Sequence, residues 1–334
     1  MLKKALTFLC IFLCITVGGL FFLITQPVMR VPDKTIPPPV DPLVLERDVR
    51  TFSEAFHPRC YDHTENLDAA ADYIAERFEK AGGRVVIQSF PKDELEYKNI
   101  TAAFGPEGGP VLIVGAHYDS YGENYYEPPL YTPGADDNAS GVAGLLALAD
   151  LLGERPPAKR VLLAAYCLEE PPFFRTQDMG SAHHAAAVHA AEEAVIGMIS
   201  LEMLGYFSDE EGTQQYPSGV MELVYPSKGN FIGVVGRFQD MALTRRVKTA
   251  MAAVSNLPVH SMNAPPLVMG IDFSDHRNYW IYGYEAIMIT NTAFYRNHAY
   301  HTDRDTADRL DYPRMAKVVQ GVFAAVMDLT GTWQ

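Results

Sequence analysis

The sequence predicts an α/β fold in which short strands alternate with helices. Apolar runs of strand length occur at 111–115, 161–167, 195–201 and 286–290, and segments with helical periodicity lie between them. Runs that are continuously apolar are typical of strands buried on both faces, as in a largely parallel sheet covered by helices. The 334 residues, 48% of them hydrophobic, suffice for a large core.

The first 25 residues predict a transmembrane anchor. Residues 5–25 are uncharged and strongly apolar, and they reach the ~20 residues that a spanning helix needs. A signal sequence is the alternative, although a cleaved signal has a shorter apolar stretch of about 7 to 15 residues. Lys3 and Lys4 favour a cytoplasmic N-terminus, with Arg30 opposing them on the far side. We therefore expect a single-pass membrane protein whose remaining chain lies on the periplasmic or extracellular side.

The next segment, 26–44, is rich in proline and predicts an extended linker that holds the rest of the chain off the bilayer. No internal repeat and no second low-complexity break follows it. Residues 45–334 are therefore interpreted as one folded domain.

Within this domain the expected elements follow in order. Thr64 can cap a helix whose apolar positions recur at helical spacing and which ends at Gly82 and Gly83. A further helix follows Asn138, and the last one follows Pro313. The expected strands are 85–90, 100–104, 111–115, 161–167, 195–201, 231–235 and 286–290.

Charge and cysteine content exclude two classes of function. The net charge of −14 would repel phosphate backbones, and no Lys/Arg cluster offsets it, so nucleic acid is not an expected partner. Two cysteines, Cys60 and Cys167, lie outside the apolar N-terminal run, and we expect two separate buried thiols. Since no CxxC pair exists, a thiolate zinc site is not expected either.

Several strands end in side chains that can bind metal. His117 follows the strand at 111–115, Glu169 and Glu170 follow 161–167, and Glu202 follows 195–201. Ligands bind beyond the carboxyl ends of strands in open α/β sheets, so we expect these side chains to converge at one edge. Taken singly, each has an ordinary alternative, such as a hydrogen-bonded histidine at a strand end or a solvated acid.

Asp137 and His301 complete a set of five candidate ligands. Asp137 precedes a helix, where an aspartate is an ordinary N-cap, but its two carboxylate oxygens could also bridge two cations. Imidazole and carboxylate ligands suit zinc, and a zinc site with an open position lowers the pKa of a bound water. Glu169 and Glu170 point to different sides of a strand end, so that one can bind metal while the other faces the water as a general base. A hydrolase is the first hypothesis.

The ordered set of motifs resembles the co-catalytic dinuclear-zinc aminopeptidases of the MH clan, over about 48–330. The motifs are Tyr61-Asp62-His63-Thr64-Glu65-Asn66, Gly115-Ala116-His117-Tyr118-Asp119-Ser120, Gly134-Ala135-Asp136-Asp137-Asn138, Leu168-Glu169-Glu170, Ser200-Leu201-Glu202, Phe273-Ser274-Asp275-His276 and Tyr300-His301-Thr302-Asp303-Arg304-Asp305-Thr306. This resemblance implies a three-layer α/β/α fold with a central, mostly parallel mixed sheet, a catalytic domain at 45–334, and two zinc ions acting on peptide substrates.

The resemblance also implies a role for each residue. His117 and Glu170 would bind one zinc, Glu202 and His301 the other, and Asp137 would bridge them. Glu169 matches the general base, and Asp119 the acid behind His117. Asp275 and Tyr300 are expected either behind the metal ligands, supporting them, or in the pocket.

This sequence departs from the family pattern at two places. The position of Glu202 is commonly Asp, so an extra methylene must be accommodated in the second zinc's coordination. The stretch 171–179 lengthens the connection after the Glu pair and is a candidate pocket wall. Aromatic residues offer a candidate pocket for the substrate's first side chain, namely Tyr121, Tyr125, Tyr126, Tyr131, Phe294 and Tyr295.

We therefore expect a zinc-dependent exopeptidase, an aminopeptidase that removes N-terminal residues from peptides. Two alternatives stay open, namely a glutaminyl cyclase-like acyltransferase, which works with one zinc, and a membrane-tethered binding domain without activity. His183, His184 and His189 lie in an Ala-rich helical pattern without HExxH spacing and are expected at the surface.

Overall fold

The computed structural model describes residues 2–29, 37–125 and 127–331. Its main sheet has eight strands in the order β1-β2-β6-β3-β7-β10-β8-β9, and β4 and β5 form a separate two-stranded sheet. The strands are β1 (Arg84–Lys92), β2 (Leu95–Phe104), β3 (Val111–His117), β4 (Gly122–Glu123), β5 (Leu130–Tyr131), β6 (Arg160–Tyr166), β7 (Val195–Glu202), β8 (Ile232–Gly236), β9 (Val259–Asn263) and β10 (Ala286–Thr290).

Eight α-helices accompany the strands in the described part of the chain: α1 (Leu2–Thr25), α2 (Pro42–Arg50), α3 (Thr64–Lys80), α4 (Gly141–Glu154), α5 (Gly180–Ala190), α6 (Met241–Val254), α7 (His276–Trp280) and α8 (Tyr312–Thr330). Shorter π- or 3₁₀-helical segments are η1 (Thr51–Ala55), η2 (Ala135–Ser140), η3 (Gly219–Leu223), η4 (Phe238–Asp240), η5 (Ala293–Tyr295) and η6 (Ala307–Arg309).

The centre of the sheet is parallel and its flanks are mixed. β3 runs parallel to β6 and β7, and β10 runs parallel to β7. β2 runs antiparallel to both β1 and β6, and β8 runs antiparallel to β10. All seven residues of β3 are buried, which accounts for the unbroken apolar run at 111–115. The expected α/β/α fold with a mostly parallel mixed sheet is confirmed.

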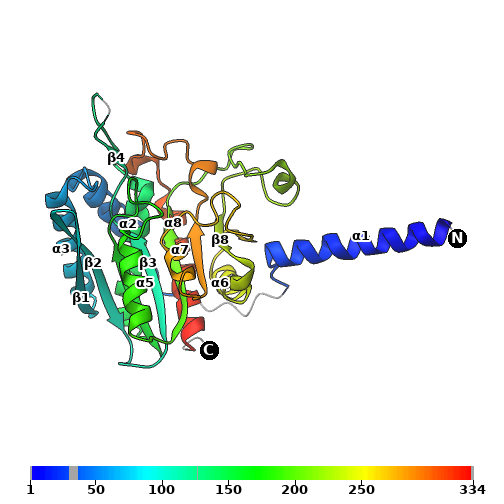
Figure 1. Cartoon of the computed structure of the whole chain (residues 1–334), viewed down its shortest axis with the longest axis horizontal. Coiled ribbons are helices and arrows are strands. Elements are labelled where there is room, and N and C mark those ends of the chain that lie inside the picture. The colour runs from blue at the N-terminus through cyan, green and yellow to red at the C-terminus, as the bar shows by residue number, and fades with distance from the viewer. Residues whose placement is uncertain (1, 30–36, 126, 332–334) are drawn as a thin grey trace.

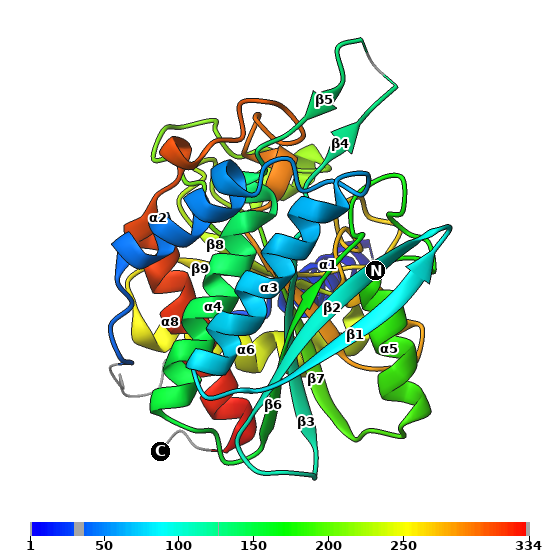
Figure 2. The ribbon, with the colours of Figure 1, turned by 90° about the vertical axis from the view of Figure 1, so that its left-hand side faces the viewer.

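Helices cover both faces of this sheet, as Figures 1 and 2 show. On one face α2, α3, α4, α6 and α8 enclose the larger hydrophobic core, which includes Leu148, Ile199 and Phe323. On the other face α5 and α7 cover a smaller core around Ile113 and Tyr279. The four central strands are thus shielded on both sides, and their carboxyl ends open at one edge.

The seven expected strands and the three expected helices are present, with ends shifted by a few residues. Cys60 and Cys167 are free and buried, as predicted. The surface prediction for the histidines of α5 was wrong at His184, which is 6% exposed and contacts the Tyr279 hydroxyl at 2.5 Å through Nδ1.

The described residues of the predicted linker, 26–29 and 37–44, include two that contact the folded domain. Gln26 is fully buried, and its side-chain oxygen accepts hydrogen bonds from Arg245 on α6. At the other end, the Pro38 carbonyl accepts a hydrogen bond from Gln320 on α8. Proline content predicts extended backbone, which can pack along a domain as readily as it can separate two bodies. Residues 30–36 of the predicted linker lie outside the described residues.

Candidate metal centre

The five candidate ligands meet at the carboxyl edge of the sheet. His117 is the last residue of β3 and Glu202 the last of β7, while Glu170 follows β6 in the connection to α5. Asp137 lies in η2 and His301 in the loop before η6. All except His301 are buried, and the His301 side chain is 22% exposed. Segments separated by more than a hundred residues therefore converge, as the strand-end argument predicted.

The ligand atoms form two groups that share Asp137. His117 Nε2 lies 3.5 Å from Asp137 Oδ1 and 3.5 Å from Glu202 Oε2. His301 Nε2 lies 3.3 Å from Asp137 Oδ2 and 3.1 Å from Glu170 Oε2. Each group offers three donor atoms within 4.8 Å of one another, and each oxygen of Asp137 faces a different group.

This arrangement corrects the expected pairing of ligands. His117 is grouped with Glu202 and not with Glu170, because β3 and β7 are adjacent strands whose last residues meet at the edge. Glu170 lies beyond β6 on the other side of β3 and turns toward His301 instead. The order of strands in the sheet decides which candidate ligands are grouped together, and the amino-acid sequence alone does not reveal that order.

Unpaired polar atoms support metal binding at this place. His117 Nε2, His301 Nε2 and Glu170 Oε1 are buried and make no hydrogen bond within the described structure. A buried polar atom without a partner is costly, and a cation would satisfy all three. The residues present therefore fit zinc, with nitrogen and oxygen ligands in both groups.

The charges of the cluster also support metal binding. Burial raises the pKa of Glu170 to about 7, opposed by the positive charge of His301. Burial would lower the pKa of His301, but the carboxylates of Glu170 and Asp137 outweigh it and raise this pKa to about 10. The same balance raises the pKa of His117, through Glu202 and Glu169. Four carboxylates in one buried site thus require positive charge, which protons or bound cations can supply.

A third cluster of donor atoms, Cys60, Asp62 and His63, differs because its carboxylate is already hydrogen-bonded. Asp62 accepts hydrogen bonds from the Cys60 thiol at 3.0 Å, from His63 Nδ1 at 2.9 Å and from the Asn124 amide at 3.0 Å. This cluster is complete as a hydrogen-bonded network.

Glu169 lies beside the two groups with its backbone held by Asp119. The two oxygens of Asp119 accept hydrogen bonds from the backbone N–H of Glu169 at 3.1 Å and of Glu170 at 3.0 Å, and Oδ1 lies 3.4 Å from His117 Nδ1. Glu169 Oε2 lies 3.9 Å from His117 Nε2. Burial raises the pKa of Glu169, and the negative charge of Glu202 adds to this effect.

The other two predicted residues also lie at the site. The ring of Tyr300 stacks on the His301 imidazole at a centroid distance of 3.8 Å, and Tyr121 stacks on it at 4.0 Å. Two near-parallel rings this close must occupy opposite faces of the imidazole, so they fix its orientation. Asp275 is fully buried before α7, and burial raises its pKa to about 7.

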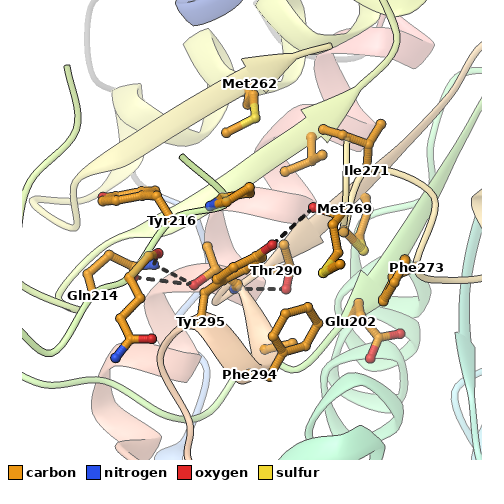
Figure 3. A pocket seen from close by; sticks show the side chains of 17 residues that line it. Glu202, Gln214, Tyr216, Met262, Met269, Ile271, Phe273, Thr290, Phe294 and Tyr295 are labelled. Carbon is orange, nitrogen blue, oxygen red and sulfur yellow. Dashed lines mark hydrogen bonds between the residues drawn. The ribbon is translucent and has the colours of Figure 1, made fainter. Parts of the chain in front are cut away.

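Two cavities adjoin the site and share Glu202 and Phe273. One, of about 250 Å³, is lined by Pro171, Phe174 and Tyr300 together with the ligands and Glu169, so the stretch 171–179 forms part of its wall as expected. The other is mainly apolar and is shown in Figure 3, with Glu202 and Phe273 at one end and Met262 at the other.

Of the aromatic residues that were proposed from sequence and that the structure describes, Phe294 and Tyr295 line this apolar pocket. Tyr121 stacks on His301, and Tyr131 packs against His63. Tyr126 lies outside the described residues.

Sequence reasoning missed the residues that position the ligands. Ser274 Oγ donates a hydrogen bond to Glu202 Oε2 at 2.8 Å. Asp305 accepts hydrogen bonds from the backbone N–H of Asp136 and of Asp137, at 3.0 to 3.2 Å. Ser274 and Asp305 stand in motifs quoted above. Membership in these motifs was the available signal in the sequence, but it did not indicate what either residue does.

Asp136 and Asn138 flank the shared ligand and hold its segment in place. Asp136 accepts hydrogen bonds from the amides of Asn291 and Asn297 at 2.8 and 3.0 Å. Asn138 donates to the Leu201 carbonyl at 2.9 Å, directly before Glu202. Gly134 precedes them with φ of +58°, where a Cβ would lie 2.3 Å from the Asp137 carbonyl oxygen, so glycine is required there.

Comparisons with known proteins agree with this geometry. Residues 99–326 match Peptidase family M28. The chain is 52% identical over 281 residues to uncharacterized protein YfbL of Escherichia coli (strain K12), covering 84% of this chain and 86% of that protein. It is 27% identical over 288 residues to leucine aminopeptidase 1 of Uncinocarpus reesii, covering 80% of this chain but only 66% of that protein.

Solved structures share the fold at low sequence identity. A Zn-dependent exopeptidase from Parabacteroides distasonis gives a TM-score of 0.64 at 20% identity and covers 90% of this chain and 100% of that one. A glutaminyl cyclase from Bacteroides thetaiotaomicron gives 0.62 at 19% identity and covers 90% and 99%. The fold alone therefore accommodates both reactions.

Proposed function

Because the chain belongs to peptidase family M28 and is therefore a peptide hydrolase, we propose that it is an aminopeptidase that uses two zinc ions. The observation that carries this proposal is the pair of three-donor groups that share Asp137, with Glu169 beside them. The relative named leucine aminopeptidase 1 supports the exopeptidase activity.

In this proposal His117, Asp137 and Glu202 would hold one zinc, and Asp137, Glu170 and His301 would hold the other. Zinc bound there would lower the pKa of a water and polarise the peptide carbonyl. The stacked tyrosines and Ser274 keep His301 and Glu202 in place for this task.

Glu169 is the proposed general base. Its carboxylate accepts the proton of the attacking water and returns it to the departing amine. Burial favours its protonated form, so its affinity for a proton exceeds that of a solvated glutamate and suits a group that takes up a proton and releases it again. Because Asp119 fixes the backbone of Glu169, the carboxylate is held at the cavity that contains the ligands.

The apolar pocket is the proposed site for the first side chain of the substrate. It adjoins the ligand Glu202 and contains Met262, Met288 and Phe294, so an uncharged apolar side chain fits its chemistry. A panel of fluorogenic amino-acid amides should show the highest kcat/KM for leucine or methionine. A preference for charged residues would rule out this pocket.

A glutamine substitution at the base tests the mechanism. Glu169→Gln should retain two zinc ions per chain and lose turnover by several orders of magnitude, whereas Glu65→Gln, at an exposed position of α3, should change neither. Turnover that survived in Glu169→Gln would show that another group is the base. One zinc per chain together with cyclisation of Gln-initial peptides would identify a glutaminyl cyclase instead.

We also propose that α1 anchors the protein in a membrane with the catalytic domain outside the cytoplasm. Residues 6–25 are long and apolar enough to cross a bilayer, a property that a signal sequence shares. Sodium carbonate extraction of membranes distinguishes the two, because an anchored chain stays in the pellet at full length.

A further inference from the structure

The end of α1 is docked on the domain by buried hydrogen bonds. The Thr25 carbonyl accepts hydrogen bonds from Lys248 Nζ at 2.7 Å and from Ser261 Oγ at 2.6 Å. One residue later, the side-chain oxygen of Gln26 accepts from Arg245 Nε and Nη2 at 2.9 and 2.7 Å. Lys248 is 7% exposed, and this burial lowers its pKa to about 8. The helix is thus fixed to β9 and α6.

The same strand, β9, holds the segment that contains η3. The Tyr225 hydroxyl, two residues beyond η3, donates to the Ser261 carbonyl at 2.8 Å. Ser261 therefore binds the end of α1 through its side chain and the η3 segment through its backbone. Figure 1 shows the short olive-green helix of η3 on the side of the domain from which α1 departs.

Large apolar side chains are exposed in the segment that contains η3 and in the loop after β9, two segments that line the same pocket. Leu223 in η3 is 86% exposed and Leu267, in the loop after β9, is 88% exposed, the two highest values among large hydrophobic side chains in the described part of the domain. Val220 and Met269 in the same two segments are 70% and 60% exposed. Leaving such side chains in water forgoes the free energy of apolar burial, and clustered exposed apolar residues mark contact sites.

We propose that these four residues, Val220, Leu223, Leu267 and Met269, form a lipid-facing surface that inserts into the bilayer spanned by α1. The inference rests on the proposed anchoring by α1. Thr25 ends the apolar span and therefore lies near the lipid headgroups, and the hydrogen bonds of Ser261 tie the η3 segment to that level. Side chains of this kind enter the boundary by about 5–10 Å. Glu222, between Val220 and Leu223, is exposed and stays among the headgroups.

The proposal also places the substrate pocket. Tyr216 and Pro217, just before η3, line the apolar pocket together with Met269 and Gly270. The two segments that contact lipid thus form part of this pocket, and the site lies at the membrane surface rather than away from it.

Tryptophan fluorescence in vesicles tests the surface. The full chain is reconstituted into phosphatidylcholine vesicles with brominated acyl chains, which quench tryptophan in contact with lipid. Leu223→Trp and Leu267→Trp should be quenched several-fold more than Val86→Trp. Val86 is 61% exposed on β1, on the side of the domain away from α1 (Figure 1). Peptidase activity confirms that each variant is folded, and the wild type gives the background of the native tryptophans.

A fourth variant, Phe12→Trp within α1, separates the proposal from its premise. Strong quenching of Phe12→Trp together with Val86-like values for Leu223→Trp and Leu267→Trp would overturn the lipid-facing surface while leaving the anchor intact. Absence of quenching in Phe12→Trp would overturn the anchor, and the proposal with it.

Discussion

Replacement of Arg59 by lysine is expected to weaken both the fold and the metal centre. The guanidinium of Arg59 is fully buried and donates to the carbonyls of Tyr118 at 2.9 Å, Pro133 at 2.9 Å and Gly134 at 3.0 Å, and also to the Phe52 carbonyl. Burial lowers its pKa to about 10, so the group stays charged at neutral pH. It joins three segments that surround the site.

The expected magnitude follows from the lost hydrogen bonds. The four carbonyls are served by three different nitrogens of Arg59, with Nη1 serving two of them, and a lysine ammonium can take the place of only one of these nitrogens, so at least two of the four carbonyls lose their partner. An unsatisfied buried group costs about 1–3 kcal/mol, so Arg59→Lys should lower the free energy of unfolding by about 4 kcal/mol. Because Gly134 lies three residues before Asp137, zinc affinity should also fall, by about 10- to 100-fold.

Two measurements check this prediction. Urea unfolding followed by circular dichroism gives the loss of stability, and competition with a chromogenic chelator gives the zinc affinity. Arg155→Lys, at an exposed position, serves as the matched control. A loss below about 1 kcal/mol, within the range of ordinary surface substitutions, would refute the reasoning from carbonyl satisfaction.

Three further predictions concern the metal centre and the core. Ser274→Ala removes the hydrogen bond to Glu202 and should weaken one zinc by about tenfold, measured by zinc titration, with the other unchanged. Chelation should lower Tm, and zinc at a thousand times its Kd should restore about 4 kcal/mol, seen by calorimetry; a Tm indifferent to zinc would contradict the assignment. Burial lowers the pKa of His184 to about 4, so the unfolded chain binds more protons than the folded chain between pH 6.5 and 4. The free energy of unfolding should therefore fall by about 3 kcal/mol as the pH is lowered through that range, measured by urea titration. His184→Gln should not show this fall.

The central strands were predictable because their burial on both faces leaves an unbroken apolar pattern. β3, β6, β7 and β10 all show it, and the polar residues at their ends predicted the edge where ligands meet. The antiparallel direction of β8 and the position of β9 were not predictable, since periodicity reports burial and says nothing of which strands are neighbours.

The residues that support the candidate ligands could not be predicted from the sequence, for a different reason. Arg59 and Asp305 act through hydrogen bonds to backbone groups that are remote in sequence, so their residue type does not indicate what they do. Only the folded chain shows that a buried arginine closes the loop before Asp137. The candidate ligands could be identified from the sequence because metal chemistry restricts which side chains can serve.

The hydrogen bonds that Asp119 accepts from two successive backbone amides have a consequence for mutagenesis. In the proposed mechanism Glu169 and Glu170 perform different tasks, but they share one hydrogen-bonded support, so a change that shifts one shifts the other. Substitutions at Asp119 and at either glutamate should then be strongly non-additive, with an interaction energy of about 0.5–3 kcal/mol in a double-mutant cycle. In that mechanism a single aspartate makes proton transfer and metal binding one cooperative unit.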